Sequence, residues 1–396
     1  MAGIVLGERM HTPRSWRIGL CLASVGWAVG CGAAEAGRDY WVYFGTFTGA
    51  KSEGIYVSRM DAYGNLSEPE LAAASPIPAF LAVDRQHRFL YAANETSDFG
   101  GKRSGSVSAF ALDARTGRLT PLNQVSAITP GPTHITVDAT GRTVLIANYA
   151  GSSVAAFPVK ADGRLGEASS FIPQHGSSVN PARQKEPHAH CVVVDAGNRF
   201  AFVCDLGLDQ VLVFKLDPVT ATLTPNEPPF AKVAPGAGPR HLAFSPDGRF
   251  AYVINEMACT VTAFAYDAAH GTLAEIQTIS TLPASETVRP EYSTAEVCVH
   301  PSGRFLYGSN RGHNSIVVYA IDGPTGKLSL VEHVPSGGRT PRNFNLDPAG
   351  RYLISANQDS GSVLVYQIDE PTGRLTPTGT KIEIDKPVCV VFVPAE

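Results

Sequence analysis

The pattern of apolar and polar residues repeats roughly every fifty residues along the chain. In each repeat a short apolar strand leads to a turn that ends in Arg, and a second apolar strand then ends at Asn or Asp. The six copies read LAVDRQHRFLYAAN, ITVDATGRTVLIAN, VVVDAGNRFAFVCD, LAFSPDGRFAYVIN, VCVHPSGRFLYGSN and FNLDPAGRYLISAN. Such self-similarity at a nearly fixed period indicates a repeat architecture.

A third and a fourth strand complete each repeat. The third strand reads, for example, SVSAFALD or QVLVFKLD, and turns such as ARTGRLTPL and PTGKLSLVE lead into the fourth. Apolar residues alternate within these strands, and Asp-Gly, Pro-Gly and Thr-Gly pairs mark the turns. Four antiparallel strands per repeat of this length are typical of a β-propeller blade.

The two ends of the chain supply the parts of a seventh blade. Residues 40–74 contain three strands but lack an innermost one, while PVCVVFV at 387–393 is a lone strand. If these segments pair, they close the ring and leave no open sheet edge. We therefore predict an all-β protein with one domain over 37–396, a seven-bladed β-propeller closed by its N- and C-terminal strands.

The first 36 residues follow a different pattern, which is typical of a secretory signal. The apolar run 18–30 is followed by Ala34-Glu35-Ala36 and preceded by Arg9, Arg14 and Arg17. With 13 residues, the run is too short to span a bilayer comfortably. We predict a signal peptide over 1–36 and a periplasmic or secreted protein. Gly30-Cys31 leaves open an alternative, a lipoprotein processing site with a lipid anchor at Cys31.

Composition and motifs exclude several classes of partner and cofactor. The net charge is -4 and no basic run is present, so we expect no nucleic-acid partner. No GxGxxG stands in a βαβ context and no GxSxG stands on a strand–turn–helix, which argues against a dinucleotide cofactor and a serine esterase. Outside the leader, five cysteines show no CxxC or close Cys/His spacing. We expect no metal site, no cofactor and a monomer.

The turn arginines place all six repeats in one register. They are Arg88, Arg142, Arg199, Arg249, Arg304 and Arg351. Six residues after them stand Asn94, Asn148, Asp205, Asn255, Asn310 and Asn357. A residue shared by every blade serves the blade itself, so we expect these side chains to bond the backbone of the turn between the second and third strands.

Blade-specific residues are more informative about function. Nine residues before or seven after the turn arginines stand His190, Arg240, Glu256, Arg311 and Arg342. In an antiparallel blade the start of the first strand and the end of the second lie on one face, so these side chains should surround one channel mouth. Within a residue or two of these positions lie His134, His188, His241, Glu296 and His313.

Converging arginines favour an anionic or carbonyl-rich ligand. They also stabilise the oxyanion that forms when water attacks an ester, and Glu256 or His190 could take the proton from that water. The set suits metal-free hydrolysis of a lactone, or the reverse closure of one. Two alternatives remain: a non-catalytic propeller scaffold with a salt-bridged channel mouth, and a Ca²⁺ site using Glu256 and Glu296, which the adjacent arginines oppose.

The segments EPHAHCVVVDAGNRFAFVCD, GPRHLAFSPDGRFAYVINE and SNRGHNSI resemble the propeller-type lactonase family, which includes 6-phosphogluconolactonases and fungal carboxymuconate-lactonizing enzymes. The resemblance covers about Tyr40 to Val393 and implies a sugar-type lactone as substrate. It implies catalytic roles for His190 (with His188 as the rival), Arg240, Glu256 and Arg311. Around them we expect the substrate to contact His188, His241, His313, Arg342 and Glu296. Because 6-phosphogluconolactone is cytoplasmic, the leader favours a non-phosphorylated or extracellular lactone.

Overall fold

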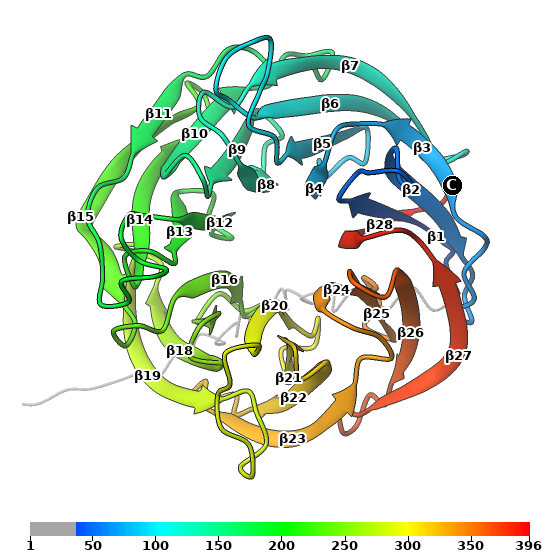
Figure 1. Cartoon of the computed structure of the whole chain (residues 1–396), viewed down its shortest axis with the longest axis vertical. Coiled ribbons are helices and arrows are strands. Elements are labelled where there is room, and N and C mark those ends of the chain that lie inside the picture. The colour runs from blue at the N-terminus through cyan, green and yellow to red at the C-terminus, as the bar shows by residue number, and fades with distance from the viewer. Residues whose placement is uncertain (1–36) are drawn as a thin grey trace, which may run out of the picture. The chain divides into compact units, whose positions relative to one another are not determined.

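The computed structural model describes residues 37–396, which form seven four-stranded antiparallel sheets arranged in a ring (Figure 1). The inner strands of neighbouring sheets contact one another around a central channel, in the order β4, β8, β12, β16, β20, β24 and β28. The predicted all-β, seven-bladed propeller is confirmed. Residues 37–396 contain no helix long and apolar enough to cross a membrane. The predicted signal peptide over 1–36 and the anchor at Cys31 lie outside the described residues.

We number the blades in ring order and give each from its inner to its outer strand. Blade 1 consists of β28 (Pro387–Pro394), β1 (Tyr40–Thr46), β2 (Gly54–Met60) and β3 (Glu70–Ala74). Blade 2 consists of β4 (Pro78–Val83), β5 (Phe89–Asn94), β6 (Ser106–Asp113) and β7 (Arg118–Ser126). Blade 3 consists of β8 (Pro132–Val137), β9 (Thr143–Asn148), β10 (Ser153–Pro158) and β11 (Ser170–Pro173).

The remaining four blades follow the same order. Blade 4 consists of β12 (Ala189–Val194), β13 (Phe200–Asp205), β14 (Gln210–Asp217) and β15 (Thr222–Lys232). Blade 5 consists of β16 (Pro239–Phe244), β17 (Phe250–Asn255), β18 (Thr260–Asp267) and β19 (Thr272–Ser280). Blade 6 consists of β20 (Ser293–Val299), β21 (Phe305–Arg311), β22 (Ser315–Ile321) and β23 (Leu328–Pro335). Blade 7 consists of β24 (Pro341–Leu346), β25 (Tyr352–Asn357), β26 (Ser362–Ile368) and β27 (Leu375–Glu383).

Blade 1 closes the ring as the sequence predicts. The C-terminal strand β28 pairs antiparallel with β1, with Val42 opposite Phe392 and Phe44 opposite Val390. The chain's last strand, in red, thus lies beside its first, in dark blue (Figure 1). Because both end segments take part in one sheet, unfolding of either end opens the ring.

Neighbouring blades are joined by a repeated contact between an aromatic pair and a glycine. In blade 5 the hydroxyl of Tyr252 donates to the carbonyl of Gly326 in blade 6, at 3.1 Å. Gly326 has φ +70°, and a Cβ there would lie 2.3 Å from the ring of Phe250. The position therefore requires glycine on both conformational and steric grounds. Equivalent hydroxyl-to-carbonyl bonds run from Tyr43 to Gly117, from Tyr91 to Gly163 and from Tyr307 to Gly373.

The recurring Asn or Asp at the end of the second strand is structural, but the expected partner is correct only for Asp205. Oδ1 of Asp205 accepts hydrogen bonds from the turn amides of Gly207 and Leu208. The asparagines instead donate. Nδ2 of Asn148, for example, bonds the carbonyl of Ala127 and Oγ of Ser153, both at 3.1 Å. A carboxylate can only accept, whereas an amide can donate to the segment arriving from the preceding blade.

Candidate functional site

A pocket of about 350 Å³ lies where the start of the inner strands and the end of the second strands meet. Its lining comes from blades 2 to 7 and consists of Glu95, Thr133, Tyr149, Arg183, His190, Glu256, Ser293, Arg311 and Arg342. All except Arg183 stand at the start of an inner strand, or at or just after the end of a second strand. The register taken from the turn arginines therefore locates the site.

Glu256 is surrounded by guanidinium groups. Its Oε2 pairs with Nε of Arg240 at 3.1 Å and with Nη2 of Arg311 at 2.9 Å, and its Oε1 pairs with Nη2 of Arg183 at 2.7 Å. Although burial raises the pKa of Glu256, Arg311, Arg240 and Arg183 together lower it to about 2. A carboxylate so fully paired is a weak base, so this geometry does not suit the role of general base expected for Glu256.

Arg240 lies behind Glu256 and is held on several sides. Its side chain is only 2% exposed, and Nη1 donates to the carbonyl of Ala295 at 2.6 Å and to Nε2 of His241 at 3.2 Å. Because Arg can only donate, Nε2 of His241 is the acceptor, and its Nδ1–H donates to Glu296 at 2.8 Å. Arg240, His241 and Glu296 thus form a bonded chain beneath the pocket. Burial raises the pKa of Glu296 to about 7.

Arg183 was not predicted. It belongs to the segment between β11 and β12, the longest of the described connections between an outer strand and the next inner strand. The neighbouring Gln184 is fully buried and fixes this segment, because its Nε2 donates to the carbonyl of Leu206 and its Oε1 accepts from the amide of Asn180. This anchoring aims Arg183 at Glu256.

His190 has a free imidazole in the pocket wall. Within residues 37–396 neither ring nitrogen has a hydrogen-bond partner, and Nδ1 is sealed from solvent, which leaves Nε2 as the nitrogen open to the pocket. Burial lowers the pKa of His190 well below its ordinary value, and the nearby charges of Arg240, Arg342 and Arg311 lower it further. His190 is therefore neutral at pH 7, with Nε2 open to the pocket.

Arg342 is the pocket's uncompensated cation. Within the described part of the chain its guanidinium forms no ion pair or hydrogen bond, and it packs over the ring of Phe47, at 5.0 Å from the centroid. Burial lowers the pKa of Arg342, and repulsion from Arg311 adds to this. Nε of Arg311 is likewise buried without a partner. Arg342 therefore keeps donor capacity for a ligand, whereas this nitrogen of Arg311 is sealed from solvent.

Comparisons with known proteins show the family of the chain. Residues 41–392 match the family model described as "Lactonase, 7-bladed beta-propeller". The chain belongs to this lactonase family. It is 36% identical over 354 residues to the 6-phosphogluconolactonase of Bacillus subtilis, covering 89% of this chain and 98% of that one. It is 31% identical to the 6-phosphogluconolactonase of Formosa agariphila, covering 77% and 86%. The structure of the Pseudomonas aeruginosa periplasmic gluconolactonase superimposes with a TM-score of 0.85 at 34% identity, covering 90% and 100%.

Membership of the lactonase family decides between two alternatives that the sequence left open. The protein is a lactone-hydrolysing enzyme and not a non-catalytic scaffold. The two remaining predicted histidines of this lactonase lie outside the pocket lining. His188 stacks on Tyr149 with ring centroids 4.4 Å apart, so it supports a pocket residue from behind. His313 bonds Oγ of Ser315 at 2.7 Å and packs against the ring of Tyr292. His190, and not His188, is the histidine that faces the pocket.

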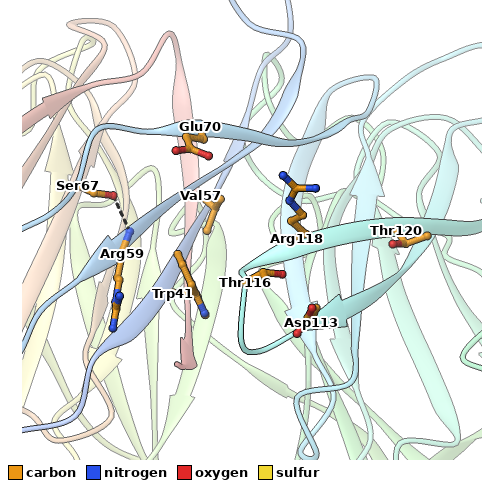
Figure 2. Close-up of a pocket in the computed structure, with 9 residues that line it drawn as sticks. All are labelled: Trp41, Val57, Arg59, Ser67, Glu70, Asp113, Thr116, Arg118 and Thr120. Atoms are coloured by element: carbon orange, nitrogen blue, oxygen red, sulfur yellow. Dashed lines mark hydrogen bonds between the residues drawn. The ribbon is translucent and has the colours of Figure 1, made fainter. Parts of the chain in front are cut away.

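A larger hollow of the lactonase, about 660 Å³, lies away from the channel mouth. Figure 2 shows its lining from two blades, with Trp41, Arg59 and Glu70 on one side and Asp113 and Arg118 on the other. Its polar groups are occupied or solvated, since Trp41 donates to a backbone carbonyl at 2.8 Å and Arg59 pairs with Asp39. The hollow therefore lacks the unpaired buried groups that distinguish the channel pocket.

Proposed function

We propose that this lactonase hydrolyses a sugar lactone without a metal or cofactor, in the pocket at the channel mouth. The observation that carries the proposal is a wall in which Arg342 and His190 are unpaired beside a fully paired Glu256. The substrate class comes from the relatives, which include a 6-phosphogluconolactonase and a gluconolactonase.

The arginines would polarise the lactone carbonyl. When water adds to the carbonyl carbon, the oxygen gains negative charge, and fixed guanidinium donors in a water-poor site stabilise that charge. Arg342 and Arg311 both line the pocket with their positive charge, so they are the proposed oxyanion partners. Glu256 and Arg240 act indirectly, because their ion pairs hold Arg311 and Arg183 in place.

His190 would accept the proton from the attacking water. It is neutral, lines the pocket and has no competing hydrogen bond. The oxyanion that forms opposite it offsets the positive charge that His190 acquires. The proposal moves the base from Glu256 to His190 and keeps both in the catalytic set.

Two features support a reaction without metal. Arginines fill the channel mouth, and cations there repel a divalent ion. Within residues 37–396 no group of three or more His, Cys, Asp or Glu side chains is arranged to share a metal ion.

The proposal includes export of the enzyme. The leader-like segment over 1–36 supports it, and so does the likeness to a periplasmic gluconolactonase. An exported enzyme would meet non-phosphorylated sugar lactones rather than a cytoplasmic phosphorylated one.

The test measures hydrolysis of D-glucono-δ-lactone and its 6-phosphate by purified protein, with and without EDTA. We expect activity that EDTA leaves unchanged. His190→Gln should lower kcat by roughly 10²–10⁴, while His270→Gln, 73% exposed on the rim, should have no effect. Because the pKa of His190 lies well below 6.5 and the base must be deprotonated, activity should persist below pH 6.5 and fall only as pH drops through that lowered pKa. Full activity of His190→Gln would contradict the proposal, and so would loss of the wild-type activity in EDTA.

A further inference from the structure

Glu95 is a second ionisable group in the pocket wall that the steps above leave unused. It follows directly on β5 in blade 2, and its backbone amide donates to the carbonyl of Ile77 at 2.9 Å, which fixes its position. Its side chain lines the same pocket as His190 and Arg342. Glu95 and Glu256 each stand seven residues after a turn arginine, and among the six repeats only these two have a carboxylate at that position.

The surroundings of Glu95 differ from those of Glu256 in every respect that matters for ionisation. Glu256 has three guanidinium partners, whereas within residues 37–396 the side chain of Glu95 forms neither an ion pair nor a hydrogen bond. Its Oε2 is sealed from solvent without a partner, so Oε1 is the oxygen that reaches the pocket. An ionised carboxylate with one sealed, unpaired oxygen is unfavourable, whereas a protonated one needs only to place its O–H outward.

Lactone hydrolysis needs such a proton donor. Water adds to the carbonyl carbon and gives a proton to a base, and the bond between that carbon and the ring oxygen then breaks. The ring oxygen leaves as an alkoxide, a poor leaving group unless a proton reaches it as the bond breaks. His190, which holds the proton from water, stands in blade 4, while Glu95 approaches the pocket from blade 2.

We infer that Glu95 is the general acid of the reaction and delivers its proton to the departing ring oxygen. The inference rests on the proposed function. The O–H bond of Glu95 breaks, the ring oxygen becomes the hydroxyl of the product, and the carboxylate of Glu95 is reprotonated by the proton that His190 received. One water is consumed, and no oxidant or reductant is needed. Burial raises the pKa of Glu95 against the opposing charges of Arg342 and Arg240, which agrees with a group that carries a proton before the reaction. Two carboxylates in one pocket with pKa values pushed in opposite directions are the pattern expected of distinct roles.

The experiment compares an oxygen lactone with the thiolactone of the same ring. A thiolate, with a pKa near 8.5 for its acid, leaves without help from an acid, whereas an alkoxide does not. Glu95→Gln keeps the shape of the side chain but cannot transfer a proton. We expect it to lower kcat on the oxygen lactone roughly 10²-fold or more and to change kcat on the thiolactone less than about threefold.

Three further measurements complete the test. Glu95→Asp should recover part of the activity, the basic limb of the pH profile should vanish in Glu95→Gln, and Glu383→Gln, 84% exposed on blade 7, should match the wild type. Equal losses on both substrates, or no loss on either, would overturn the role of Glu95. Retained thiolactone turnover shows that the variant is folded and that the site binds its substrate. Failure of the wild type to hydrolyse either compound would instead overturn the proposed function.

Discussion

Replacing Glu256 by Gln tests whether this residue balances charge or accepts a proton. The sequence alone suggests a catalytic base whose loss would leave the melting temperature nearly unchanged. The structure gives the opposite expectation, because Glu256 is 8% exposed and neutralises a neighbourhood that holds Arg240, Arg311 and Arg183. Gln keeps the shape but leaves these guanidinium groups facing one another without a carboxylate.

The pKa of Glu256 gives the magnitude. A lowering from 4.5 to about 2, at ~1.4 kcal/mol per unit, corresponds to ~3 kcal/mol of stability at neutral pH. The carboxyl is almost fully buried, so solvent screening reduces this little. The figure agrees with the ~3–5 kcal/mol typical for removal of one partner of a buried ion pair. Because the folded pKa is the lower one, the contribution is complete above pH 4.5 and is lost as pH falls towards 2.

The assay is equilibrium unfolding in urea at pH 7 and again near pH 3. We expect Glu256→Gln to unfold with ~3 kcal/mol less stability at pH 7, and the difference to shrink to roughly half near pH 3. Glu383→Gln removes an exposed carboxylate 3.9 Å from Lys381 and should change stability by less than ~1 kcal/mol. Equal stability of Glu256→Gln and wild type at pH 7 would refute the reasoning, since the arginines would then not depend on this carboxylate.

Two more outcomes are expected. Asn148→Ala removes the hydrogen bonds to Ala127 and Ser153 and leaves a buried carbonyl unsatisfied. It should therefore lower the free energy of unfolding by ~1–3 kcal/mol. Turnover per folded molecule should stay the same, which activity normalised to the folded fraction measures. Protein isolated from its native host should have lost about its first 30 to 36 residues, which intact-mass measurement checks. A chain that still starts at Met1 would contradict export.

Most of the fold follows from the sequence because each blade repeats the same local rules. The turn arginines set a register, and strand alternation then fixes which residues face the channel. Even the closure was predictable, since Val388–Phe392 lacks a local partner and the first strands lack an inner neighbour. The partners of the recurring asparagines were not predictable. For Asn148 one partner, Ala127, lies in the segment arriving from the preceding blade, whereas Asn255 bonds Thr260 and Thr262 of its own blade, and no pattern within one repeat records which of these contacts forms.

The site, like the fold, has residues that the sequence predicts and residues that it does not. His190, Glu256, Arg311 and Arg342 stand at register positions, and the structure brings them to one pocket. Arg183 does not stand at a register position, because it lies in a long connection between β11 and β12 that is positioned by tertiary bonds of Gln184. Glu95 stood at a register position too, but only its missing partners distinguish it from an ordinary salt-bridged carboxylate.

The proposed roles of the pocket residues depend on which of their polar groups have no hydrogen-bond or ion-pair partner in the protein. Glu256 and Arg240 have partners for their charged groups, so their contribution is to hold the pocket in shape before any substrate arrives. Arg342, His190 and Glu95 are buried or partly buried polar groups that the fold leaves incomplete. Burying such groups destabilises the fold, and a propeller could fill the same positions with apolar side chains. In the proposed reaction the lactone carbonyl would accept from Arg342, the attacking water would give its proton to His190, and the departing ring oxygen would take a proton from Glu95. The proposed reacting groups are therefore those with unpaired atoms, whereas the charge alone would have selected Glu256.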